Sequence, residues 1–271
     1  MAFRRRSADP LRQAIRLPAH AIYLHWTFAE PDIHTLEFDM TIYNDPGPDV
    51  GEYFAPFSGY IGDAQAYGGI QTDLYRPDIG GIGKGALFST WWSFDAADTR
   101  IAFDGFIQLG THEGRFVGVR RPVQWGVGNW RFAFRRTDEL DVSGDWYSCS
   151  LAPLAGDTRS GERPAAVGEE LWIGSMRFPR TGDRRASIGG SFPSFLEVYN
   201  GARNYSDIAE WHLDVMAYGN GKRADGLRTD YPAYPYAEVP NADAWFDATR
   251  GRVHVRFGSD TLRENAPTAI F

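Results

Sequence analysis

The sequence predicts an all-β protein: an antiparallel β-sandwich of the jelly-roll or concanavalin-like kind, with little helix. Three observations lead to this prediction. Aromatic residues make up 15% of the 271 residues, the chain has 30 glycines and 16 prolines, and apolar residues repeatedly alternate with polar ones. Rings and β-branched side chains suit a half-buried pleated surface, whereas glycine and proline supply turns. Short strands at fairly even spacing are typical of stacked antiparallel sheets.

Alternation with a period of two identifies the clearest strands. In the segment 35–43, Leu36, Phe38, Met40 and Ile42 share one face, and polar residues occupy the other. The same pattern is found in the segments 130–135, 211–216 and 252–257. Further strands are expected at 86–94, 101–109, 116–120, 146–151, 171–178 and 195–199.

The connections between these strands indicate a single domain. Proline, glycine and polar residues are concentrated in them, but none is long and biased enough to form a clear interdomain linker. We therefore expect one β-sandwich domain over residues 1–271, with a short N-terminal extension at about 1–18. The segment 9–16 is the one plausible helix, and 219–243 is expected to be an aromatic loop packed on the surface.

The charge balance limits the classes of partner. The formal net charge is -7, from 35 acidic and 28 basic residues. An acidic surface repels phosphate backbones, so we expect no nucleic-acid binding. Arginine runs at 4–6, 120–121 and 135–136 are typical of solvated faces, and a bound anionic group is the alternative.

The chain shows neither a convincing export signal nor a membrane span. No stretch approaches the roughly 20 apolar residues of a membrane helix, so we expect no membrane partner. The three arginines at 4–6 are not followed by an apolar region. We therefore expect a cytoplasmic protein, or a secreted one whose export signal has been removed. The sequence leaves the oligomeric state open.

The single cysteine and the glycine clusters predict no cofactor site. Cys149 excludes an intrachain disulfide and lies in a predicted strand, where a small buried apolar role is typical. Glycines near Lys84 lack the order of a phosphate-binding loop, and a hairpin is the better interpretation.

Rings and amides between residues 60 and 134 form the candidate ligand site. Sugars present an apolar C–H face and a rim of hydroxyl groups, so they need flat rings beside polar partners. We expect Gln71, Trp91, Arg115 and Trp125 to bind such a ligand, with Trp125 exposed in a glycine-flanked loop. Trp91 and Trp92 are neighbours in a predicted strand, so at most one faces a shared groove. The alternative for each ring is an ordinary core position.

His112 and Glu113 are the candidate catalytic residues. They lie in a predicted turn beside Arg115, and turns at strand ends often carry functional side chains. A neighbouring arginine would keep the glutamate ionised and suit it to a role as a base. The alternative is a structural glutamate that caps the turn or pairs with Arg115.

Two further groups are weaker candidates. Glu37 and Asp39 share a strand face at about 7 Å, which matches the carboxylate spacing of glycosidases, but alternating acids on a solvent-facing strand are ordinary. The six histidines show no metal-ligand spacing, so no metal site is predicted. A site assembled from distant strands, such as His25 with His212 and Asp214, remains open.

Seven short motifs follow one another along the chain. They are YGGIQ at 67–71, LFSTW at 87–91, EG at 113–114, the stretch 125–132, DWYS at 145–148, WIGSMR at 172–177 and SFLE at 194–197. In order and spacing they resemble the uncharacterised bacterial family called domain of unknown function 3472, over roughly residues 60–215. That family usually has an aromatic residue at the position of Gly68 and more glycines around Glu113. The resemblance implies a β-sandwich whose relatives often occur in exported proteins beside carbohydrate-binding-like modules. It implies no established reaction.

Together these patterns favour a non-catalytic protein that recognises a glycan or a small polar ligand. A carbohydrate-active enzyme, either a hydrolase or a lyase, with Glu113 as its acid or base is the alternative. A structural or assembly protein is the second alternative.

Overall fold

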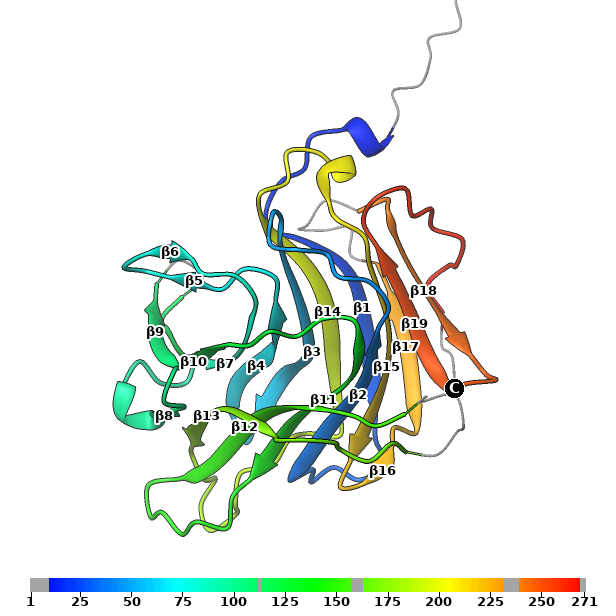
Figure 1. The fold of residues 1–271 in the computed structure, drawn as a ribbon. Helices are drawn as coiled ribbons and strands as arrows, with labels where there is room; N and C mark the ends of the chain where they lie inside the picture. Colours follow the sequence, from blue (N-terminus) through cyan, green and yellow to red (C-terminus); the bar gives the residue numbers. More distant parts are fainter. Residues whose placement is uncertain (1–9, 112–113, 157–162, 232–238, 269–271) are drawn as a thin grey trace, which may run out of the picture.

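Two large antiparallel sheets pack face to face in the computed structural model (Figure 1), which describes residues 10–111, 114–156, 163–231 and 239–268. The predicted antiparallel β-sandwich is therefore confirmed. Helical structure is limited to short 3-10 turns in this part of the chain. No helix in it is long and apolar enough to cross a membrane.

The first sheet has eight strands, and the chain enters and leaves it repeatedly. In spatial order these strands are β17 (Gly226–Asp230), β1 (Ala19–Thr27), β14 (Ser191–Asn200), β3 (Gly51–Ile61), β4 (Ala64–Gln71), β7 (Gly85–Thr90), β10 (Phe116–Pro122) and β9 (Phe106–Gly110).

The second sheet has nine strands. Its main order is β18 (Ala242–Asp247), β19 (Arg252–Phe257), β15 (Trp211–Gly219), β2 (Thr35–Ile42), β11 (Gly128–Arg136), β12 (Asp145–Pro153), β13 (Leu171–Phe178) and β8 (Thr99–Ile101), and β16 (Lys222–Arg223) pairs with β15.

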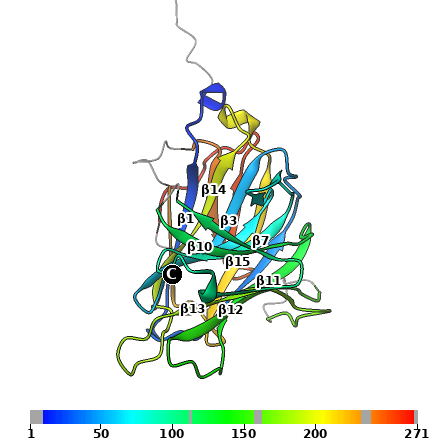
Figure 2. The same ribbon diagram turned by 90° about the vertical axis from the view of Figure 1, so that its left-hand side faces the viewer.

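The remaining elements are small. A two-stranded ribbon joins β5 (Tyr75–Arg76) to β6 (Gly80–Gly81), where the glycine-rich hairpin was predicted. The 3-10 turns are η1 (Pro10–Arg12), η2 (Ala96–Asp98) and η4 (Tyr205–Asp207). Figure 2 shows η1 beside η4 at one end of the molecule.

Aromatic rings from both sheets form the core between them. Phe134 of β11 is fully buried, with ring centroids 5.2 Å from Phe57 of β3 and 5.1 Å from Phe88 of β7. Gly68 of β4 makes room for this ring, because a Cβ there would lie 2.8 Å from two of its atoms. Close ring packing across the interface therefore fixes how the two sheets face each other.

Several predicted boundaries are wrong for identifiable reasons. The expected strand 101–109 is broken by a turn, in which Gly105 donates a backbone hydrogen bond to Ala102, so β8 and β9 join different sheets. The expected strand 86–94 ends at Thr90. The expected loop 219–243 contains β16, β17 and the start of β18, and its residues 232–238 lie outside the described ranges.

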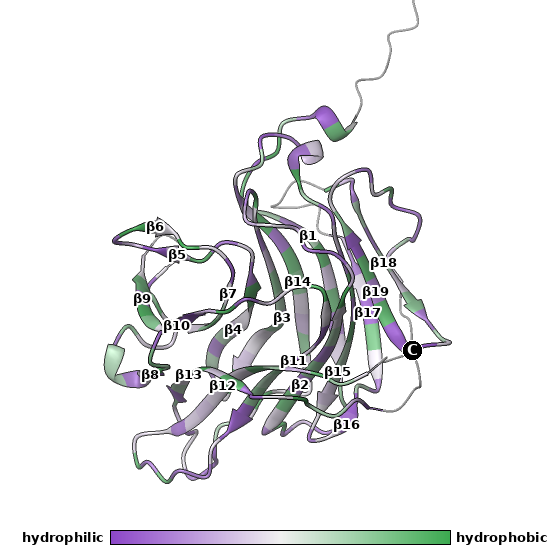
Figure 3. Cartoon of the chain, viewed as in Figure 1, coloured by the Kyte–Doolittle hydropathy of each residue, from purple (hydrophilic) through white to green (hydrophobic). Residues whose placement is uncertain are grey.

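Strands β1, β3 and β4 lacked a clear alternation in the sequence, although β3 and β4 lie at the centre of the first sheet. Their residues mix hydrophobic and hydrophilic types along each strand (Figure 3). In β3, Phe54 and Phe57 face the core between the sheets, whereas Tyr53 and Ala55 pack in a second, smaller apolar cluster on the other face. Burial on both faces makes a strand read as a continuous apolar run.

Glu52 of β3 is a fully buried acid. Burial raises its pKa from 4.5 to about 9, although a backbone hydrogen bond with Ala209 acts in the opposite direction. The folded protein therefore keeps this carboxyl group protonated near neutral pH, whereas the unfolded chain ionises it.

We expect Phe134→Ala to lower the free energy of unfolding by about 3–5 kcal/mol, because it leaves a cavity where two sheets meet. Urea denaturation followed by circular dichroism measures the change. Phe103→Ala is the matched control, since that ring is 107% exposed, and it should change stability by less than about 0.5 kcal/mol. Equal effects of the two substitutions would contradict the assigned core.

The stability of the protein should fall as the pH rises from 4.5 towards 9, because over that range the folded state holds a proton on Glu52 that the unfolded state releases. Glu52→Gln removes this contribution. Relative to Glu52→Gln, the free energy of unfolding of the parent should fall by up to about 1.4 kcal/mol per pH unit. Urea titrations between pH 5 and 8 test this, and a constant difference between the two proteins would refute it.

Candidate functional site

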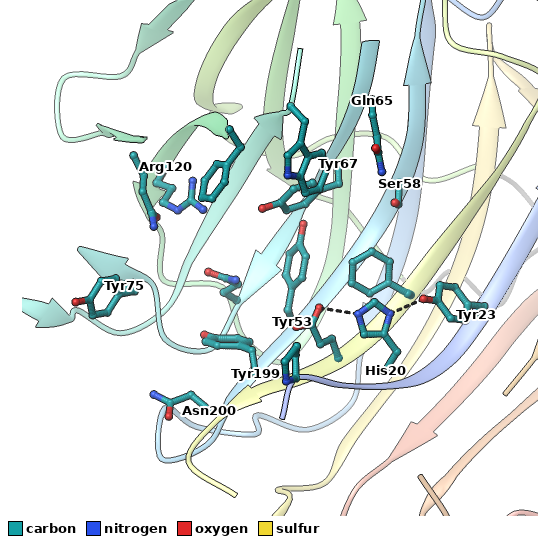
Figure 4. Close-up of a pocket in the computed structure, with 17 residues that line it drawn as sticks. His20, Tyr23, Tyr53, Ser58, Gln65, Tyr67, Tyr75, Arg120, Tyr199 and Asn200 are labelled. Carbon is teal, nitrogen blue, oxygen red and sulfur yellow. Dashed lines mark hydrogen bonds and ion pairs between the residues drawn. The ribbon is translucent and has the colours of Figure 1, made fainter. Parts of the chain in front are cut away.

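A cavity of about 780 Å³ lies on the face of the eight-stranded sheet that points away from the core. Its floor includes Tyr53 and Phe195, two members of the small apolar cluster on that face. Polar and aromatic side chains from β1, β14, β3, β4, β9 and β10 surround this floor, as Figure 4 shows. The cavity is large enough for an organic ligand.

One row of side chains crosses four neighbouring strands in direct register. His20 of β1 lies opposite Glu197 of β14, which lies opposite Tyr53 of β3, which lies opposite Gln71 of β4. Facing residues on paired strands have their Cβ atoms about 5 Å apart and on the same face. Strand pairing therefore brings an imidazole, a carboxylate, a phenol and an amide into one line.

His20 lies between a hydroxyl group and a carboxylate at one end of this row. Its Nδ1 is 2.5 Å from the Tyr23 hydroxyl, and its Nε2 is 3.3 Å from a Glu197 carboxylate oxygen. The ring also stacks on Phe195, with centroids 4.7 Å apart. Both nitrogens are thus oriented by partners, an arrangement that can hold or transfer a proton.

Arg120 of β10 brings a buried positive charge to the cavity. It is only 5% exposed, its Nη1 donates a hydrogen bond of 3.4 Å to Ser89, and burial lowers its pKa. Gly118 permits this position, because a Cβ there would lie 2.5 Å from that Nη1. Within the described ranges, the groups that raise the pKa of Arg120 are the tyrosines Tyr53, Tyr67 and Tyr199, and no carboxylate forms an ion pair with it.

Rings and amides complete the wall between these two charged ends. Tyr67 packs against Trp91 with centroids 4.8 Å apart, and Gln65 and Gln108 add amide groups. The buried hydroxyl of Tyr53 has no hydrogen-bond partner among the described residues, and burial raises its pKa well above the usual value. The cavity therefore offers flat rings and hydrogen-bonding groups to a polar ligand.

Two of the residues predicted to bind ligand, Gln71 and Trp91, line this cavity. Trp92 does not line it and is 56% exposed; both tryptophans follow the end of β7 at Thr90, so the strand alternation expected to separate them does not reach them. Arg115 lies elsewhere, exposed and with its guanidinium 4.5 Å from the ring centroid of Phe94.

The expectation that Trp125 is exposed is wrong. Its side chain is 2% exposed and stacks on Trp211 in the core, with ring centroids 5.3 Å apart. Its indole N–H donates to the carbonyl oxygen of Gly85 at 3.1 Å, and Lys84 covers the ring with its Nζ 4.4 Å from the centroid. The glycines beside it let the loop turn inward, so Trp125 cannot stack on a ligand.

The predicted catalytic pair, His112 and Glu113, lies outside the described residues. Glu37 and Asp39, the weaker pair, project from the outer face of the other sheet. Arg131 holds Asp39 at 2.6 Å and Arg135 holds Glu37 at 2.7 Å. Burial raises the pKa of Glu37, but hydrogen bonds from Arg163 and Arg135 outweigh it and lower the pKa. These buried ion pairs give the two acids a structural role and remove them from the cavity.

Cys149 is fully buried, and burial raises the pKa of its thiol well above the usual value. A thiol that stays protonated is a poor nucleophile.

Sequence reasoning missed His20, Glu197, Tyr53 and Arg120. Each lines the cavity because adjacent residues of a strand point to opposite faces, and these four point to the face away from the core. Within β10, the pair Arg120 and Arg121 was a visible signal, since adjacent residues of a strand point to opposite faces. Two adjacent arginines in one strand must therefore face different environments.

No protein-family model matches this chain, and no curated protein matches it.

Proposed function

We propose that the protein binds an acidic carbohydrate in the cavity of the eight-stranded sheet. The observation that carries this proposal is Arg120, a buried guanidinium in the cavity wall without a carboxylate partner among the described residues. A buried charge is costly unless it is paired. A carboxylate or sulfate group on a ligand would supply that partner through two parallel hydrogen bonds.

The shape of the lining favours a carbohydrate over a compact anion. His20 on β1 and Arg120 on β10 are five strand steps apart in the sheet, or about 24 Å along it. Figure 4 places them at opposite sides of the cavity. Rings such as Trp91 and Tyr67 and amides such as Gln71 lie between them, which suits an extended chain of sugars with apolar faces and hydroxyl rims.

Arg120→Met should weaken the binding of an acidic oligosaccharide by about 10- to 100-fold, because it removes a charge-assisted contact. Isothermal titration with oligogalacturonate and oligoalginate, beside neutral cello-oligosaccharide, measures this. Acidic chains should bind the parent protein and neutral chains should bind it weakly.

Arg121→Met is the matched control. It removes the same charge from the next position of the strand, where Arg121 contacts Asp104 at 2.6 Å outside the cavity. This variant should keep the affinity of the parent protein. Equal affinities of the two variants, or equal binding of neutral and acidic chains, would disprove the proposal.

A carbohydrate-active enzyme is the second candidate, favoured by the contacts of His20 with Glu197 and Tyr23. Glu197 is the one carboxylate among the described residues that line the cavity. The two-carboxylate chemistry of most glycosidases therefore has no pair there. His20 is instead the group placed to act as general base or acid, with Glu197 orienting its ring.

If the cavity is catalytic, incubation with acidic polysaccharides should produce new reducing ends or unsaturated products. His20→Gln should then lower the rate by about 100-fold or more, since general acid–base catalysis contributes that much. His25→Gln is the control, because His25 lies on the same strand but does not line the cavity. Full activity of His20→Gln would exclude His20 as the general acid or base. Absence of any product would leave ligand binding without catalysis as the function of the cavity.

A further inference from the structure

Two histidines and an aspartate meet on the outer face of the nine-stranded sheet, across the core from the cavity. In β15, Trp211 and Leu213 are buried in the core, so His212 and Asp214 project from the opposite face. His254 of β19 lies directly opposite Asp214 in the strand pairing. Figure 1 shows β15 and β19 side by side.

One ligand-type atom from each of these three residues lies within 4.8 Å of the other two. Asp214 is fully buried and His254 is 7% exposed. Within the described part of the chain, Nε2 of His212, Oδ1 of Asp214 and Nδ1 of His254 are buried atoms without a hydrogen-bond partner. Oδ1 and Nδ1 lie 2.5 Å apart as an ion pair, so Nε2 of His212 is the atom of the three that has neither a hydrogen bond nor an ion pair among the described residues.

Neighbouring side chains hold the second carboxylate oxygen of Asp214 and the second ring nitrogen of His254. The Tyr43 hydroxyl donates to Oδ2 of Asp214 at 2.5 Å, and Arg250 lies 3.6 Å from the same oxygen. Asp247 lies 3.4 Å from Nε2 of His254. A carboxylate on one imidazole nitrogen fixes the ring so that the other nitrogen presents its lone pair, which is the usual support of a metal-binding histidine.

Stacked rings and charge balance support the same arrangement. Tyr43 stacks on His212 with centroids 4.6 Å apart, and Trp245 stacks on His254 with centroids 5.0 Å apart. Asp247 also lies 3.6 Å from Arg250 and offsets its positive charge. The cluster therefore combines restrained imidazoles with a buried carboxylate.

We propose that His212, Asp214 and His254 bind a divalent transition-metal ion, with Zn²⁺ as its simplest representative. Two imidazoles and one carboxylate are the ligands that Zn²⁺ and related ions prefer, and three protein ligands leave a further coordination position open. The third ligand is His254 and not His25, which lies on β1 in the other sheet with its Nε2 3.9 Å from Asp230. This site does not depend on the function of the cavity.

Titration of chelator-treated protein with Zn²⁺ in a calorimeter should show one equivalent bound, and Co²⁺ should give the visible absorption bands of a protein-bound ion. Asp214→Asn and His254→Gln should each weaken binding by more than about 100-fold. Asp247→Asn should weaken it by about 10- to 100-fold, the usual effect of losing a supporting group. Thermal unfolding should shift upward with Zn²⁺ in the parent protein but not in Asp214→Asn or His254→Gln.

His20→Gln is the matched control, because it alters the histidine–carboxylate pair of the cavity and should keep full Zn²⁺ affinity. Absence of Zn²⁺ binding to the parent protein would overturn the proposal and leave a plain histidine–aspartate ion pair. Unchanged binding in both Asp214→Asn and His254→Gln would also overturn it. The parent titration decides the matter even if a variant fails to fold.

Discussion

The eight-stranded sheet depends on one constraint: successive side chains of a strand point to opposite faces, and both faces of this sheet are covered. Phe54 of β3 reaches the core, where its ring contacts Trp211 of the other sheet, while the adjacent Tyr53 enters the cavity. A slip of one residue in the pairing would exchange these two sets. The ring packing of the core therefore also fixes the register that aligns His20, Glu197, Tyr53 and Gln71.

Arginine has two distinct uses in this acidic protein. Many arginines form ion pairs with carboxylates of the same chain. Arg131 pairs with Asp39, and Arg185 pairs with Asp145 at 2.7 Å. Arg120 is buried among tyrosines instead. The prediction that arginine runs form solvated faces therefore fails at 120–121, where one side chain enters the cavity and its neighbour pairs with Asp104. A binding site for an anion is the use that this difference supports.

The cavity and the proposed metal site lie on the two outer faces of the sandwich, with the shared core between them. The cavity draws on β1, β14, β3, β4 and β10, whereas the histidine–aspartate cluster draws on β15 and β19. Neither site uses a residue of the other. Each is built by the same means, a direct pairing between strands that places side chains from distant parts of the chain at neighbouring positions.

The sequence by itself determined the antiparallel β class and the faces of strands such as 35–43, because alternation is a local property of the chain. It also identified Gln71 and Trp91 as ligand candidates. Only the tertiary structure decided that Trp125 is buried and that His20 and Arg120 share a cavity. It also decided that His254, far along the chain, lies opposite Asp214. The physical reason is that strand pairing and the covering of each face depend on contacts between residues far apart in the chain. Alternation with a period of two shows which residues share a face, but not what that face packs against.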